Sequence, residues 1–202
     1  MSVRTVSDMQ LRGWIFDLDG TLTVAQHDFV AIRRELGVPA DVDILGYLET
    51  LPSTERQRLN AQLDAIELRL AREVEPAPGA AQLIRELHQR GARLGILTRN
   101  LRRVAMASLE RIGVLDCFAA HDVLGRDDAV PKPAPDGIQR LLCDWQLAPT
   151  EAVMVGDFRF DLEAGRAAGC HTCLVLADNT WPALTDVHVP DCHALLALVR
   201  AR

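Results

Sequence analysis

Apolar and polar positions follow two different patterns along the chain. Short, almost uninterrupted apolar runs have the length and composition of strands that are buried on both faces of a parallel sheet. These runs lie at residues 13–17, 93–98, 152–155 and 172–176, with shorter ones near 118–120 or 123–124 and at 187–189. From residue 80 onward, stretches with apolar residues at helical spacing separate the runs, and Gly91, Gly113 and Gly169 end three of them. The alternation predicts an α/β fold with a doubly wound parallel sheet.

The segment 27–75 differs because its apolar positions follow helical spacing throughout. It contains a stripe that ends near Gly37, a second stretch that stops at Pro52, and a long periodic stretch. The long stretch carries Leu59, Leu63, Ile66, Leu70 and Val74. A Pro-Ala-Pro-Gly linker at 76–79 closes the segment. We therefore predict a small helical insertion at 27–75 within a core formed by 1–26 and 76–202.

Composition narrows the class of protein. The chain has 202 residues, of which 49% are hydrophobic and 25% charged, as expected for one globular domain with a small insertion. A formal charge of -6 argues against a nucleic-acid partner, which normally meets a basic face. No apolar run is long enough to span a bilayer, and residues 1–10 lack the apolar core of a secretory signal. We expect a cytoplasmic protein without a membrane partner, and either a monomer or a homodimer.

The cysteines do not predict a structural framework. The chain has five of them, an odd and scattered set that does not suit a disulfide network. Cys170, Cys173 and Cys192, with His171 and His193 beside them, leave a zinc site as an alternative. We favour the interpretation that these cysteines are small apolar residues flanking a core strand.

Polar side chains follow several of the predicted strands. Asp17 and Asp19 follow the first, Thr98 the second and Asp157 a later one, with Asp161 one helical turn beyond. The carboxyl ends of parallel strands meet at one edge of the sheet, where ligands bind in such folds. Paired carboxylates at a strand end repel one another and favour a divalent cation with oxygen ligands. An Asp-Gly pair is also common in plain turns, so the first pair alone does not decide the matter.

Lys132 is the only lysine of the chain, and every other basic side chain apart from histidine is arginine. A compact ammonium suits contact with a single anionic group better than the planar guanidinium does. Prolines at 131, 133 and 135 stiffen the loop that carries Lys132. Acids, a hydroxyl and an ammonium form the set that phosphoryl transfer through a metal requires.

These residues resemble the four motifs of the haloacid dehalogenase superfamily, in its phosphatase branch. The run Asp17-Leu18-Asp19-Gly20-Thr21-Leu22 resembles the first motif, Thr98 the second, Lys132 the third, and the run from Gly156 to Asp161 the fourth. The insertion at 27–75 stands where the phosphoglycolate-phosphatase-like group places a helical cap. The resemblance covers nearly the whole chain and implies a Rossmann-like core.

The resemblance also implies roles for single residues. Asp17 is expected to be the nucleophile that forms an aspartyl phosphate, and Asp19 the general acid and base. Magnesium is expected to bind Asp17, the backbone carbonyl of Asp19 and Asp157, with Asp161 assisting directly or through water. Thr98 and Lys132 are expected to hold the phosphoryl oxygens of a small phosphorylated metabolite, either phosphoglycolate-like or a sugar phosphate.

The substrate and the exact reaction stay open. Many relatives follow the first motif with an acidic or small polar pair, whereas this chain has Thr-Val-Ala-Gln at 23–26 and a short insertion. Arg99 and Asn100 are candidates for contact with the substrate, but a solvated Arg99 and a helix-capping Asn100 are the favoured alternative. A phosphomutase acting on a sugar phosphate, and a binding protein without turnover, stay as alternatives to the phosphatase.

Overall fold

A single parallel sheet forms the centre of the computed structural model, which describes residues 9–24 and 29–201. Its six strands are arranged in the order β3-β2-β1-β4-β5-β6, and every neighbouring pair is parallel. They are β1 (Gly13–Phe16), β2 (Arg93–Leu97), β3 (Val123–Leu124), β4 (Ala152–Gly156), β5 (His171–Val175) and β6 (Val187–Val189). The chain proceeds outward from β1 in one direction and from β4 in the other. The predicted doubly wound parallel sheet is therefore confirmed, and its switch point lies between β1 and β4.

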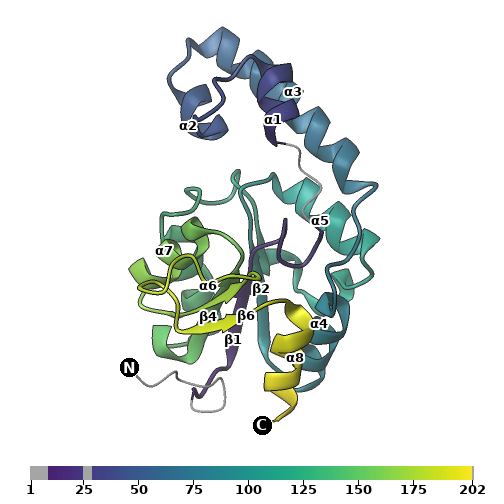
Figure 1. Cartoon of the computed structure of the whole chain (residues 1–202), viewed down its shortest axis with the longest axis vertical. Helices are drawn as coiled ribbons and strands as arrows, with labels where there is room; N and C mark the ends of the chain where they lie inside the picture. Colours follow the sequence, from purple (N-terminus) through teal and green to yellow (C-terminus); the bar gives the residue numbers. More distant parts are fainter. Residues whose placement is uncertain (1–8, 25–28, 202) are drawn as a thin grey trace.

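Helices cover both faces of this sheet (Figure 1). The five long ones are α4 (Ala80–Gln89), α5 (Arg102–Arg111), α6 (Asp136–Trp145), α7 (Arg159–Ala167) and α8 (Cys192–Arg200). Short 3-10 turns occupy Leu115–Cys117, Ala120–Asp122 and Pro149–Glu151. In Figure 1, α6 and α7 lie to the left of the sheet, and α4, α5 and α8 lie to its right.

The core is divided in two by the sheet, as the alternation of side chains along β1 requires. Trp14 and Phe16 belong to the apolar cluster that includes residues of α4, α5 and α8. Ile15, between them in the sequence, belongs to the cluster formed with α6 and α7. All three side chains are almost completely buried. Successive residues of a strand point to opposite faces, so a strand with helices on both sides needs apolar residues at every position.

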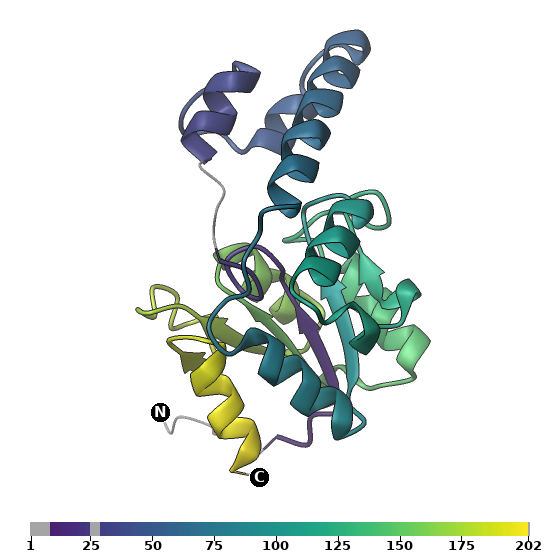
Figure 2. The same cartoon turned by 90° about the vertical axis from the view of Figure 1, so that its right-hand side faces the viewer.

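Three further helices stand apart from the sheet, beyond the carboxyl ends of its strands (Figures 1 and 2). They are α1 (Phe29–Leu36), α2 (Ile44–Glu49) and α3 (Ser53–Ala71). Their buried residues form a separate apolar cluster that includes Ile32, Leu48 and Leu63. The predicted helical character of this part of the chain is confirmed for residues 29–71. These helices reach the core mainly through α3, which packs against α5.

Two connections join the helical segment to the core, and they run side by side. Thr23 pairs with Pro76 in an antiparallel bridge. The N–H of Val24 donates to the carbonyl of Glu75 at 2.9 Å, and the N–H of Ala77 donates to the carbonyl of Leu22 at 2.9 Å. The predicted boundary at 75–76 falls within this pairing, whereas the one at 26–27 lies outside the described residues. The division into core and cap stays a prediction.

Within residues 9–24 and 29–201, no helix combines the length and the apolar character needed to cross a bilayer. The cytoplasmic location stays a prediction from the sequence.

Candidate active site

The candidate site lies at the switch point, where β1 and β4 end next to each other. Asp17 follows β1, and its N–H donates to the carbonyl of Val155 in β4 at 2.8 Å. Asp157 follows β4. Two positions beside these acids must be glycine, because the carboxylates approach the backbone there too closely for a Cβ. A Cβ at Gly20, whose φ is 86°, would lie 2.4 Å from Oδ2 of Asp157, and one at Gly156 would lie 2.3 Å from the carboxyl carbon of Asp161.

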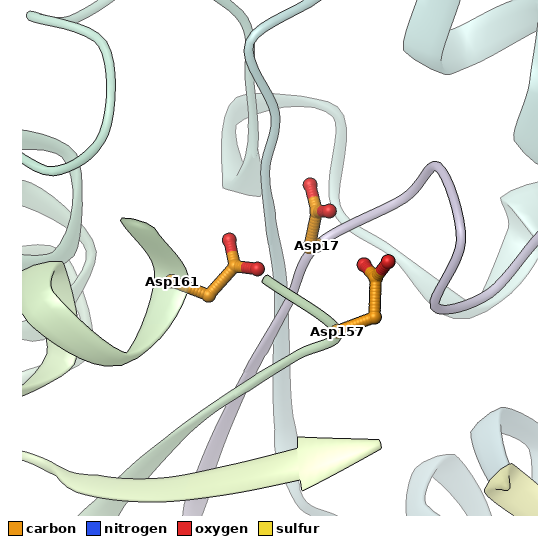
Figure 3. A group of neighbouring side chains, drawn as sticks. All are labelled: Asp17, Asp157 and Asp161. Carbon is orange, nitrogen blue, oxygen red and sulfur yellow. The ribbon is translucent and has the colours of Figure 1, made fainter. Parts of the chain in front are cut away.

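Asp17, Asp157 and Asp161 form an acid cluster. Each offers a carboxylate oxygen, and the three oxygens lie within 4.8 Å of one another. Figure 3 shows their carboxylates converging from the ends of β1 and β4 and from the first turn of α7. Thr21 donates its hydroxyl to Oδ1 of Asp157 at 2.9 Å and so orients one of them. The structure thus brings together three residues predicted to ligate a metal.

Burial sets the electrostatics of the acid cluster. It raises the pKa of Asp157 to about 7, and the charges of Asp17 and Asp161 add to the effect. It also raises the pKa of Asp161 to about 6, against the opposing effect of Lys132. Carboxylates held together in this way favour a bound cation, and hard oxygen ligands are those that Mg²⁺ takes. The chemistry of these donors therefore fits a divalent cation.

Lys132 joins two members of the acid cluster. Its Nζ donates to Oδ1 of Asp17 and to Oδ1 of Asp161, both at 2.6 Å, and its side chain is only 3% exposed. Burial acts to lower the pKa of Lys132, but the charges of Asp161 and Asp17 outweigh it and raise the pKa above its ordinary value. The chain's single lysine is therefore a charged donor in direct contact with the predicted nucleophile.

Asp19 lies beside the acid cluster and has a different partner. Its Oδ2 accepts a hydrogen bond from Nδ2 of Asn100 at 2.6 Å. Burial raises the pKa of Asp19 to about 8, and the charges of Asp17 and Glu67 add to the effect. Its carboxylate is not part of the group that could hold a metal in the described residues. The sequence prediction used only its backbone carbonyl as a ligand, and that role stays a prediction.

Thr98, Arg99 and Asn100 follow β2, the strand beside β1. Thr98 is buried, and its Oγ1 accepts the N–H of Asn100 at 3.1 Å. The expectation that Asn100 caps a helix is wrong, because α5 begins at Arg102 with Leu101 as its N-cap and no side-chain capping bond. The buried side-chain amide of Asn100 serves Asp19 instead.

Arg99 connects the core to the helical segment rather than being merely solvated. Its Nη2 donates to Oδ2 of Asp43 at 2.8 Å, and Asp43 is the N-cap of α2. Its guanidinium carbon lies 5.0 Å from the centroid of the Phe160 ring. Neither partner was predicted, although the N-capping pattern before α2 was visible in the sequence. Contact of Arg99 with a substrate stays a prediction.

A second group of charges joins α3 to the core, and we call it the arginine network: Asp64, Glu67, Arg103 and Arg126. Arg126 donates from Nη1 to both carboxylate oxygens of Glu67, at 2.9 and 2.8 Å, and from Nη2 to Asp64 at 2.7 Å. Arg103 donates to the other oxygen of Asp64 at 3.1 Å. Burial raises the pKa of Glu67 to about 7, and Arg126 opposes it.

Sequence analysis missed the arginine network. Asp64 and Glu67 are three residues apart in α3, so they share a helix face. That spacing was visible in the sequence, but nothing in it identified Arg126 as their partner.

The zinc alternative is not supported by the described residues. All five cysteines are free, and four of them, including Cys170, Cys173 and Cys192, are buried. The one group of acids, histidines or cysteines that could hold a metal in the described ranges is the acid cluster. The buried cysteines are therefore core residues, as favoured above.

Comparison with known proteins agrees with this geometry. The family model for haloacid dehalogenase-like hydrolases matches residues 11–169. An uncharacterized hydrolase of Saccharomyces cerevisiae is 28% identical over 94% of this chain and 91% of its own length. A phosphoglycolate phosphatase of Escherichia coli O157:H7 is 27% identical over 86% of this chain and 67% of its own length.

The fold also has solved counterparts. A crystal structure described as a putative phosphoglycolate phosphatase from Lactobacillus plantarum has a TM-score of 0.74 at 22% identity, covering 94% of this chain and all of that one. A likeness at this identity supports the fold and no more. The predicted family, and the prediction of an enzyme of this family, are confirmed. The chain belongs to the haloacid dehalogenase-like hydrolases.

Proposed function

We propose that this hydrolase is a magnesium-dependent phosphatase that acts on a small phosphorylated metabolite through an aspartyl-phosphate intermediate. The observation that carries the proposal is the contact of Lys132 with Asp17 inside a buried cluster of three carboxylates. A cation and a lysine together neutralise the repulsion between a carboxylate nucleophile and a phosphate dianion. The relative that is a phosphoglycolate phosphatase supports the same class of reaction.

In the first half of the proposed reaction, a carboxylate oxygen of Asp17 attacks phosphorus. The bond between phosphorus and the leaving oxygen breaks, and Asp19 gives that oxygen its proton. In the second half, Asp19 takes a proton from water, the water oxygen bonds to phosphorus, and the bond to Asp17 breaks. Inorganic phosphate leaves and Asp17 is regenerated.

The surrounding residues supply charge and position. Bound magnesium would be held by Asp17, the backbone carbonyl of Asp19, Asp157 and Asp161, and would supply positive charge beside the phosphate. Lys132 and Thr98 are assigned to the phosphoryl oxygens, where charge shifts during transfer. The helical segment 27–75 acts as a cap that excludes bulk water, consistent with the position of α1–α3 beyond the strand ends.

We assign the substrate to the phosphoglycolate-like or sugar phosphate class. The direct test is phosphate release from a panel of such metabolites and from para-nitrophenyl phosphate, with magnesium present. Asp17→Asn is expected to reduce turnover by more than about 10³-fold while the protein stays folded. Asp144→Asn is the matched control, because Asp144 is an exposed acid at the end of α6.

Two results would contradict the proposal. Undiminished turnover by Asp17→Asn would show that Asp17 is not the nucleophile. Phosphate that moves within a sugar phosphate without appearing in solution would indicate a phosphomutase.

A further inference from the structure

The side chain of Asn100 binds a residue distant in the sequence instead of capping the nearby helix. Its amide nitrogen lies 2.6 Å from Oδ2 of Asp19, although 81 positions separate the two residues. An asparagine at this distance from a helix start commonly serves as a cap, but the N-cap of α5 is Leu101. Asn100 is only 8% exposed, and burying an amide is costly unless it makes a hydrogen bond. Its bond to Asp19 supplies this compensation.

The backbone of Asn100 is held on both sides. Its N–H donates to Oγ1 of Thr98 at 3.1 Å, and its carbonyl accepts the N–H of Arg126 at 2.9 Å. The guanidinium of Arg126 also donates to the preceding carbonyl, that of Arg99, at 3.0 Å. The amide is therefore presented from a fixed turn, which suits a group that must hold another side chain in one orientation.

The space beside the pair is small. Asp19 and Asn100 border a cavity of about 10 Å³, roughly the room for one water molecule. Its other walls include Val74, Val104 and Glu67, and Asp19 itself is only half-buried. The amide of Asn100 is buried, so its bond to Asp19 meets less competition from solvent than one on the surface.

We propose that Asn100 is a positioning residue that decides which oxygen of Asp19 carries the transferred proton. The inference rests on the proposed function, in which Asp19 protonates the leaving oxygen. In the orientation that the structure gives, the NH₂ group of Asn100 faces Oδ2 of Asp19 and can only donate to it, so the proton of the acid form resides on Oδ1. Rotation of the carboxyl that exchanged its two oxygens would bring the acid proton against the amide hydrogens. Asn100 therefore holds Oδ1 as the oxygen that gives the proton and later takes one from water.

This role predicts a dependence on the leaving group. A leaving oxygen that is a poor base, such as dinitrophenolate, departs without a proton, whereas an alkoxide needs one. The quantity to measure is kcat/KM, because it covers binding and the step in which the alcohol or phenol departs. The substrates are dinitrophenyl, para-nitrophenyl, phenyl and alkyl phosphates, all with magnesium.

Asn100→Ala is expected to lower kcat/KM by about 10²-fold for phenyl and alkyl phosphates, and by less than about 3-fold for dinitrophenyl phosphate. Asn100→Leu keeps about the size of the side chain but removes the donor without adding charge, and it should show the same graded loss if the alanine variant does not fold. Asn60→Ala in α3 is the matched control and should leave all four substrates unaffected.

An equal loss across the four substrates would overturn the inference, because a merely structural defect does not distinguish leaving groups. Full activity of Asn100→Ala on alkyl phosphate would overturn it as well. Either result leaves the proposed function intact as long as the wild-type enzyme releases phosphate and Asp17→Asn does not. If the wild-type protein turned over none of these esters, the result would contradict both the proposed function and the role of Asn100.

Discussion

The acid cluster and the arginine network are both groups of charges with buried members, yet their charges are balanced differently. The arginine network sets two arginines against two carboxylates, and each carboxylate oxygen named above accepts from a guanidinium. The acid cluster sets three carboxylates against one ammonium. One group is complete within the chain, whereas the other lacks positive charge.

This difference separates a structural role from a chemical one. A balanced network fastens α3 to the core and needs nothing further, although burying it gains little over apolar packing. An uncompensated set of carboxylates is unfavourable in the apoprotein, and it persists where a cation is bound. The difference supports the proposal that the reaction takes place at the acid cluster, and it assigns the arginine network to the attachment of the helical segment.

The largest expected effect comes from removing a ligand of the acid cluster. Asp157→Asn is expected to weaken magnesium binding by at least about 100-fold and to reduce turnover correspondingly. Wild-type protein should gain thermal stability on adding magnesium and lose turnover on treatment with a chelator. Calorimetry and melting curves of wild type, Asp157→Asn and the control Asp144→Asn give the measurement. Equal magnesium affinity in all three would contradict the placement of the metal.

The affinity for magnesium should also depend on pH in a defined direction. The pKa of Asp157 is raised to about 7 and that of Asp161 to about 6, from an ordinary value of 3.8. Below these values the ligands carry protons that the metal must displace. Affinity should therefore rise from about pH 5.5 to pH 8, and titrations in buffers with different ionisation enthalpies should detect proton release. Affinity that is flat across this range would contradict the raised values.

Breaking the arginine network should lower the stability of the fold. Arg126→Met leaves Glu67 and Asp64 buried without their main partner, so the free energy of unfolding should fall by about 3 kcal/mol. The backbone N–H that binds Asn100 is retained in this variant. Arg103→Met is the matched control, because the Arg103 side chain is 59% exposed, and its loss should cost about 0.5 kcal/mol. Urea denaturation at pH 7.5 gives the comparison, and similar losses in both variants would argue against a special role for Arg126.

The smallest effect concerns the pH dependence of stability. The pKa of Glu67 is raised from 4.5 to about 7, so the folded state holds its proton more tightly than the unfolded state does. The resulting contribution to stability is fully present below about pH 4.5 and is lost as pH rises through about 7. Glu67→Gln should abolish this loss, which is at most about 3 kcal/mol for the wild type. Glu49→Gln, at an exposed site, should keep the wild-type profile, and an unchanged profile in Glu67→Gln would contradict the raised pKa.

Local patterns in the sequence were sufficient for the longer strands, but they left the short β3 open between 118–120 and 123–124, and the structure places it at Val123–Leu124. Each strand of a doubly wound fold is buried on both faces, so apolar runs such as 152–155 marked the strands directly. The predicted first residues of the helices were less accurate. The spacing of apolar residues predicts a helix from residue 133 or 134 to Trp145, but α6 begins at Asp136, because that spacing does not describe the backbone of the proline-rich loop before it.

The sequence by itself determined which residues gather at the candidate site. Asp17, Thr98 and Asp157 follow parallel strands, and parallel strands end at the same edge, so their placement at that edge follows from the alternation of strands and helices along the chain. Only the tertiary structure decided which side chains surround them and how the helical segment is attached beside them. The bonds from Asn100 to Asp19, from Arg99 to Asp43 and from Arg126 to Glu67 join residues 81, 56 and 59 positions apart. Such pairs depend on how helices pack against the sheet, and no periodicity along the chain records that packing.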